Sequence, residues 1–105
     1  MSETIKIELD KYVDFISSLA GVLQIYLFGS YAGGEPHKTS DIDLMIIIEN
    51  NLDPFKTAYK IRRSLTDTDL ALDIVVNRKS AFEEASEESS FQKTIKETGV
   101  LLYAT

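Results

Sequence analysis

The feature that most constrains the fold is a run of five apolar residues, Leu44-Met45-Ile46-Ile47-Ile48, directly preceded by Asp41-Ile42-Asp43. A strand that is apolar on both faces belongs inside a sheet covered on both sides. Side chains alternate along a strand, so Asp41 and Asp43 point to the same side, about 6.6 Å apart along the backbone. The sequence therefore predicts a central strand over residues 42–48, with two carboxylates at its solvent-accessible beginning.

The flanking sequence predicts further helices and strands around this one. They are a helix over 8–22, a strand over 23–28, a loop over 31–40 with one helical turn after Ser30, a helix from Asp53-Pro54 to 65, a strand over 70–76, acidic helices from 79 capped by Ser80 or Ser90 and ended by Gly99, and a closing strand over 100–103. In the helix that starts at Asp53-Pro54, the apolar spacing places Phe55, Ala58, Tyr59, Ile61 and Leu65 inward. The fold class is therefore α+β (mixed α/β), a small mixed sheet with helices on at least one face.

Composition and charge limit the classes of protein. The 105 residues, 1–105, suit one domain with one core. A net charge of −6 with scattered basic residues argues against direct nucleic-acid binding, but allows a metal-bound nucleotide or a basic partner protein. No apolar run reaches the roughly 18–20 residues of a membrane span. The N-terminus lacks the order of a secretory signal and cysteine is absent, so we expect a cytoplasmic protein without disulfides.

Asp73 lies in Leu72-Asp73-Ile74-Val75-Val76, the interior of an expected strand. A buried carboxylate is costly to keep ionised unless it is paired or binds a metal. If this strand lies beside the strand over 42–48, Asp73 completes a cluster with Asp41 and Asp43. Mg²⁺ would neutralise the cluster, because it takes oxygen ligands from a few carboxylates, water and substrate phosphates. Two such ions activate an attacking oxygen and stabilise a leaving one, which points to phosphoryl or nucleotidyl transfer.

Gly29-Ser30, at the end of the strand over 23–28, fits the same chemistry. Glycine lets the backbone approach a ligand closely, and Ser30 offers a hydroxyl and backbone N–H groups to phosphate oxygens. A Gly-Ser pair alone is usually a turn, and Asp-x-Asp is usually a cap or a solvated edge. Gly, Ser, Asp and Asp at this fixed spacing arise by chance in about one chain in a thousand of this length, so the combination is informative.

Gly29-Ser30, ten intervening residues and Asp41-Ile42-Asp43 resemble the G-S-x10-D-x-D signature of the polymerase-β-like nucleotidyltransferase superfamily, and Asp73 resembles its third carboxylate. The short chain, its leading helix and the ending Glu97-Thr98-Gly99-Val100-Leu101-Leu102-Tyr103 are similar to the minimal nucleotidyltransferases, the MNT proteins of prokaryotes.

The resemblance implies a role for each matching residue. Asp41 and Asp43 would bind the metals that carry the ATP triphosphate, Asp73 would share one metal and help to activate the acceptor hydroxyl, and Gly29 and Ser30 would contact the phosphates. With two Mg²⁺ ions, AMP would move from ATP to the acceptor. Many MNT proteins are antitoxins of HEPN-domain RNase toxins, so the resemblance also implies a HEPN partner, neutralised through AMP transfer to a tyrosine.

One departure from the family pattern leaves alternatives open. Many relatives carry Arg where this chain has Gly33, and Lys38 or Arg62 are candidates to compensate. The missing Arg motivates a second alternative, an antitoxin that blocks its partner by contact alone. A third alternative is a transferase acting on a small molecule such as an aminoglycoside, for which 105 residues leave little room.

The remaining polar and aromatic residues have simpler interpretations. His37, the single histidine, is expected to be a solvated loop residue, and Glu83, Glu84, Glu87 and Glu88 an exposed helix face. The tyrosines at helical or strand spacing and the phenylalanines are expected mostly in the core. Tyr31 is the exception, expected near the nucleotide because it follows the Ser30 turn.

Overall fold

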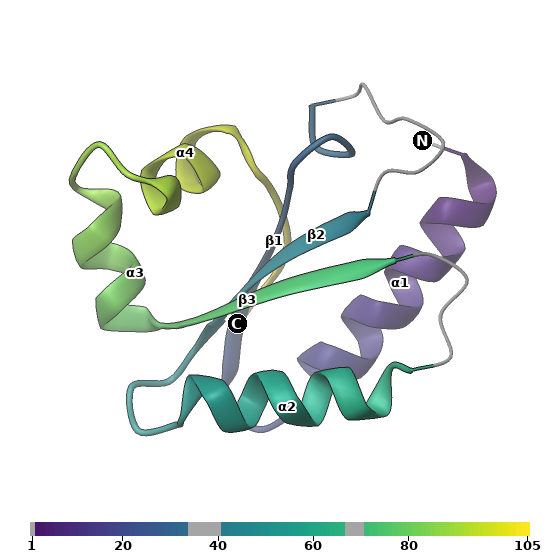
Figure 1. Ribbon diagram of the computed structural model, residues 1–105, viewed down its shortest axis with the longest axis horizontal. Helices are drawn as coiled ribbons and strands as arrows, with labels where there is room; N and C mark the ends of the chain where they lie inside the picture. The colour runs from purple at the N-terminus through teal and green to yellow at the C-terminus, as the bar shows by residue number, and fades with distance from the viewer. Residues whose placement is uncertain (1, 34–40, 67–70) are drawn as a thin grey trace.

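The computed structural model describes residues 2–33, 41–66 and 71–105. The elements follow the predicted order (Figure 1): α1 (Glu3–Ser17), β1 (Val22–Phe28), β2 (Ile42–Ile48), α2 (Pro54–Ser64), β3 (Leu72–Arg78), α3 (Lys79–Ser86), α4 (Phe91–Thr98) and β4 (Val100–Ala104). The predicted α+β class is confirmed. None of the helices in these ranges is long and apolar enough to cross a membrane.

The sheet has the strand order β3-β2-β1-β4. β1 runs antiparallel to both β2 and β4, whereas β2 and β3 are parallel and joined through α2. β2 is therefore an inner strand, as its continuous apolar sequence predicted, and its residues 44–48 are at most 1% exposed. This burial fixes β2 as the rigid centre of the sheet.

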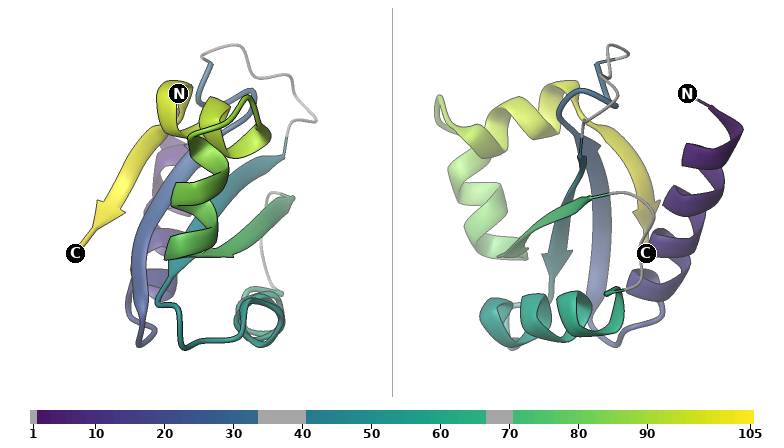
Figure 2. Two further views of the ribbon diagram at one scale, coloured as in Figure 1. Left: turned by 90° about the vertical axis from the view of Figure 1, so that its left-hand side faces the viewer. Right: turned by 45° about the vertical axis from the view of Figure 1, so that its right-hand side comes forward.

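Helices cover both faces of the sheet, with β1 and β2 between them (Figure 2). On one face, Tyr12 and Ile16 of α1 and Ile61 of α2 pack in a core cluster with alternate β2 residues such as Leu44 and Ile46. On the other face, the α3 and α4 side chains pack against the intervening β2 residues, in a cluster made of Met45, Ile47, Phe82 and Ile95. The face shared by α3 and α4 is also the face of Asp43, because Asp43 and Met45 are two residues apart on one strand.

Two predicted boundaries differ from the observed ones. α1 starts at Glu3 rather than near residue 8, because the Ser2 hydroxyl accepts a hydrogen bond from the Ile5 N–H at 3.3 Å and caps the helix. It ends at Ser17, and Gly21, with φ at +86°, turns the chain into β1. β3 runs on to Arg78, while the predicted beginning at Leu70 lies outside the described residues.

Helix boundaries closer to the C-terminus follow the sequence more closely. Asp53 caps α2 through hydrogen bonds from the Phe55 and Lys56 N–H groups, with Pro54 at the first helical position. Ser90 caps α4, and Gly99 ends it. The alternative cap, Ser80, lies inside α3 instead. The predicted closing strand is β4, which pairs with β1.

The inward face of α2 was predicted only in part. Ile61 is fully buried, but Phe55 is 86% exposed and Tyr59 63% exposed, so the prediction that these two aromatic residues face inward is wrong. At 3.6 residues per turn, Phe55 and Tyr59 lie about 90–130° around the helix from the stripe formed by Ala58, Ile61 and Leu65. Of the apolar residues of α2, only that stripe packs in the core cluster with the sheet.

The contrast between Ile61 and Phe55 gives a stability prediction. Ile61→Ala should lower the free energy of unfolding by about 2–5 kcal/mol, because it leaves a cavity in the core. Phe55→Ala should change it by less than about 0.5 kcal/mol, as exposed substitutions do. Urea unfolding followed by circular dichroism measures both, and a loss of several kcal/mol for Phe55→Ala would show that this ring is packed inward.

Candidate active site

The parallel register of β2 and β3 brings two of the predicted acidic residues side by side. Asp43 and Asp73 are direct partners across the two strands, so their side chains point to the same face. Asp41 precedes β2 and lies two residues before Asp43. Asp73 is exposed, contrary to the expectation of burial, because it is the second residue of β3 and β3 is an edge strand.

Asp43 lies at the electrostatic centre of the three acids. Burial raises the pKa of its carboxyl, and the negative charges of Asp73 and then Asp41 raise it further. Asp43 is half-buried, whereas Asp41 is exposed at the open end of the strand. The arrangement therefore concentrates negative charge on one half-buried side chain, where a positive charge would be stabilised.

Gly29 closes one side of this acidic group. Its φ of +76° lies in the left-handed region, and a Cβ at this position would collide with Oδ2 of Asp43. Its carbonyl oxygen accepts hydrogen bonds from the N–H groups of Ala32 at 3.2 Å and Gly33 at 3.1 Å, which form the predicted helical turn after Ser30. A glycine is required here both for the backbone turn and for the space that Asp43 occupies.

An aromatic pair, which the sequence analysis assigned to the core, lies next to the carboxylates. Phe28 is the cross-strand partner of Asp43, and its ring meets the ring of Phe91 edge to face, with centroids 5.3 Å apart. Phe91 is 48% exposed. Sequence patterns could not identify this pair, because its two rings come from β1 and α4, which are far apart in the sequence and meet only in the folded protein.

Other predicted contributors lie elsewhere. His37 and Lys38 are outside the described residues. Tyr31 is only 8% exposed and belongs to the core cluster with α1 and α2 residues, so its side chain is a core residue, and its place near the nucleotide stays a prediction. Arg62 donates a hydrogen bond from Nη2 to the Ile74 carbonyl oxygen at 3.3 Å. Within the described ranges, Arg62 forms no ion pair with the three acids.

The donor set suits a divalent cation in its chemistry. Hard oxygen ligands from two or three carboxylates are those that Mg²⁺ takes, and a cation would relieve the repulsion that raises the Asp43 pKa. Across residues 2–33, 41–66 and 71–105, no three His, Cys, Asp or Glu side chains already stand close enough to hold a metal ion. A bound cation would therefore have to draw the carboxylates of Asp41, Asp43 and Asp73 together.

Comparison with known proteins identifies the family and the fold. The family model described as "Polymerase beta, Nucleotidyltransferase" matches residues 10–105. A nucleotidyltransferase structure from Sulfolobus solfataricus is similar, with a TM-score of 0.65 and 22% identity over 93% of this chain and 78% of that one.

Two toxin–antitoxin structures are also similar. One, described as a toxin-antitoxin with AMP-PNP, has a TM-score of 0.56 and 25% identity over 94% of this chain and 73% of that one. The other is a tri-AMPylated HEPN toxin of Shewanella oneidensis in complex with an MNT antitoxin. It has a TM-score of 0.51 and 22% identity over 100% of this chain and 74% of that one. No curated protein matches the chain.

The crowding of like charges predicts that Asp43→Asn stabilises the metal-free protein. Removing a charge opposite Asp73 should raise the free energy of unfolding by about 0.5 kcal/mol at pH 7. The native protein keeps a proton on Asp43 to higher pH than the unfolded chain does, so this gain should fade as the pH drops through the raised pKa and should vanish below the ordinary aspartate range.

Thermal melts in EDTA at several pH values measure this effect. The matched control is Asp10→Asn, which removes an equal charge from an exposed position on α1 and should leave the melting temperature nearly unchanged. If Asp43→Asn destabilises the metal-free protein at pH 7, the carboxylate is held by attractive contacts and not crowded by its acidic neighbours.

Proposed function

Because the chain belongs to the polymerase beta nucleotidyltransferase family, we propose that it transfers AMP from ATP to a hydroxyl group of a partner protein, with divalent cations as cofactors. The observation that carries the proposal is the register that sets Asp43 beside Asp73 on an open part of the sheet face. Nucleotidyl transfer needs convergent carboxylates at one point, and this register supplies two, with Asp41 adjoining them.

Asp41, Asp43 and Asp73 are the residues that would hold Mg²⁺. The bound cations would neutralise the triphosphate and favour the departure of pyrophosphate. Gly29, whose lack of a side chain makes room for the Asp43 carboxylate, and Ser30, which follows it at the beginning of the turn, would contact the phosphates. These five residues are the ones that the motif resemblance selected.

The exposed position of Asp73 suits it to the acceptor side of the reaction. Its carboxylate would accept the hydrogen bond of the incoming hydroxyl and take up its proton. The hydroxyl oxygen forms a bond to the α-phosphorus of ATP as the bond from that phosphorus to the β-phosphate oxygen breaks. AMP then remains on the acceptor, and pyrophosphate leaves.

The proposed partner is a HEPN-domain toxin, with a tyrosine as the acceptor. Support comes from the similar toxin–antitoxin structure that contains AMP-PNP, an ATP analogue, and from the match of the Gly-Ser and Asp-x-Asp motif to MNT antitoxins. In this role the chain is the antitoxin, and modification of the toxin would neutralise it.

Transfer of labelled AMP tests the proposed activity. The protein, Mg²⁺ and α-³²P-ATP are incubated with a HEPN-domain toxin as the proposed acceptor, and label on that toxin is measured. Asp43→Asn should lower the transfer rate by about 100-fold or more, the usual effect of removing an electrostatic group from such a site. Asp10→Asn, on the exposed side of α1, should transfer label at the wild-type rate.

Absence of label with the wild-type protein, together with full neutralisation of the toxin by Asp41→Asn, would contradict an enzymatic antitoxin. The replacement of the family's turn Arg by Gly33 makes neutralisation by contact alone the specific alternative. Calorimetry separates the two functions further, since the enzymatic one requires that AMP-PNP bind only with Mg²⁺ and only when Asp41 is present.

A further inference from the structure

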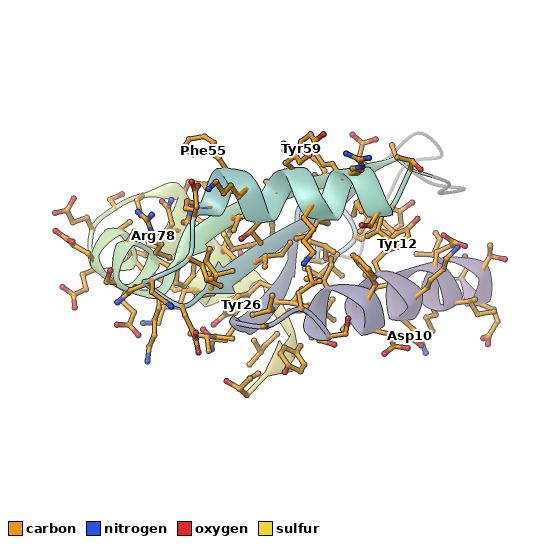
Figure 3. The ribbon with its side chains drawn as sticks, turned by 90° about the horizontal axis from the view of Figure 1, so that it is seen from below. Asp10, Tyr12, Tyr26, Phe55, Tyr59 and Arg78 are labelled. Atoms are coloured by element: carbon orange, nitrogen blue, oxygen red, sulfur yellow. The ribbon has the colours of Figure 1, made fainter. Side chains whose placement is uncertain are left out.

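α2 presents an aromatic surface that does not contribute to the core. Phe55 and Tyr59 are one helical turn apart, and Figure 3 shows both pointing away from the sheet. Their exposures of 86% and 63% are the largest among the exposed large hydrophobic residues of the described chain. Solvated aromatic rings add nothing to folding, and exposed apolar side chains that gather in one place mark interaction sites.

The same helix carries a cluster of positive charge on an otherwise acidic protein. α2 contains Lys56, Lys60, Arg62 and Arg63 and no acidic residue, although the chain has a net charge of −6. Within the described ranges, none of these four cations forms an ion pair with an acidic side chain. Arg63 instead donates from Nη1 to the Tyr59 hydroxyl at 3.3 Å, which orients the exposed ring. We call Phe55, Tyr59 and these four cations the α2 patch.

A groove of about 400 Å³ adjoins the α2 patch. Phe55, Ala58 and Arg62 line its α2 side, and residues 74–77 of β3 line the other. β3 is an edge strand, so its outer side is not covered by another strand. Arg62 donates to the Ile74 carbonyl oxygen on this strand, which disfavours addition of a further strand and favours side chains that enter the groove.

The groove and Asp73 share the edge strand β3. Val75, one of its lining residues, is two residues after Asp73 and faces the same side of the sheet, about 6.6 Å along the strand. α2 packs on the face of the sheet opposite to Asp73, so a protein bound over α2 would reach this carboxylate by extending around the β3 edge.

We propose that the α2 patch and its groove are the docking surface for the protein acceptor, and that they bind a segment with apolar side chains flanked by Asp or Glu. This inference rests on the proposed function. Aromatic and Arg side chains are the commonest energetic centres of protein interfaces, and the four α2 cations match an acidic segment. A symmetric contact with a second copy would set these cations against themselves, which disfavours self-association here.

Binding of the HEPN-domain protein to a double variant, Phe55→Ala with Tyr59→Ala, tests the surface. Calorimetry should show at least about 30-fold weaker binding, as for the loss of one central interface residue. The affinity for Mg²⁺ and AMP-PNP should stay within twofold of the wild type, because the patch is not part of the nucleotide site. Ile7→Ala, which trims an apolar side chain that is 60% exposed on α1, is the matched control and should bind normally.

A charge variant tests the acidic character of the partner segment. Arg63→Glu should weaken binding more than Lys6→Glu, an equal charge change on an exposed residue of α1, and the difference should shrink as salt increases. Wild-type affinity in the double aromatic variant would overturn the docking surface. So would a wild-type dimer that the double variant dissociates while acceptor binding persists. Acceptor binding without AMP transfer in the wild type would instead overturn the proposed function and leave the docking surface standing.

Discussion

The parallel pairing of β2 with β3 is the constraint on which the candidate site depends. It fixes Asp43 opposite Asp73 on strands that lie about 4.8 Å apart. Two like charges in direct cross-strand register oppose folding, and burial of Asp43 adds to the cost, as the raised pKa of its carboxyl records. The fold holds them there nonetheless, which is what a site for cations and phosphates requires.

The buried residues of β2 account for this tolerance. Residues 44–48 are packed between α1 and α2 on one face and α3 and α4 on the other. A shift of β2 by one residue would turn Leu44 and Met45 to the wrong faces and unpack both clusters. The register that fills the two core clusters is therefore the same register that places Asp43 opposite Asp73. The chain cannot fill these clusters without bringing the two carboxylates together.

Much of this arrangement followed from the sequence, where local chemistry was decisive. The five-residue apolar run predicted the inner strand, Asp53-Pro54 predicted the start of α2, and Gly29 predicted the turn at the end of β1. What sequence could not supply were properties set by packing. Apolar periodicity placed Phe55 and Tyr59 inward, but a single stripe through Ile61 was enough to cover the sheet. Likewise Tyr31 follows the Gly-Ser turn in sequence, yet its ring enters the core.

Manganese diffraction tests the central claim most directly. A crystal of the protein grown with AMP-PNP and Mn²⁺, a substitute for Mg²⁺ with a usable anomalous signal, locates the ion without assumptions about activity. The account predicts an anomalous peak within coordination distance of carboxylate oxygens from both Asp43 and Asp73, next to the phosphates. A nucleotide bound with no metal at these two residues, or a metal held by other groups, would contradict it.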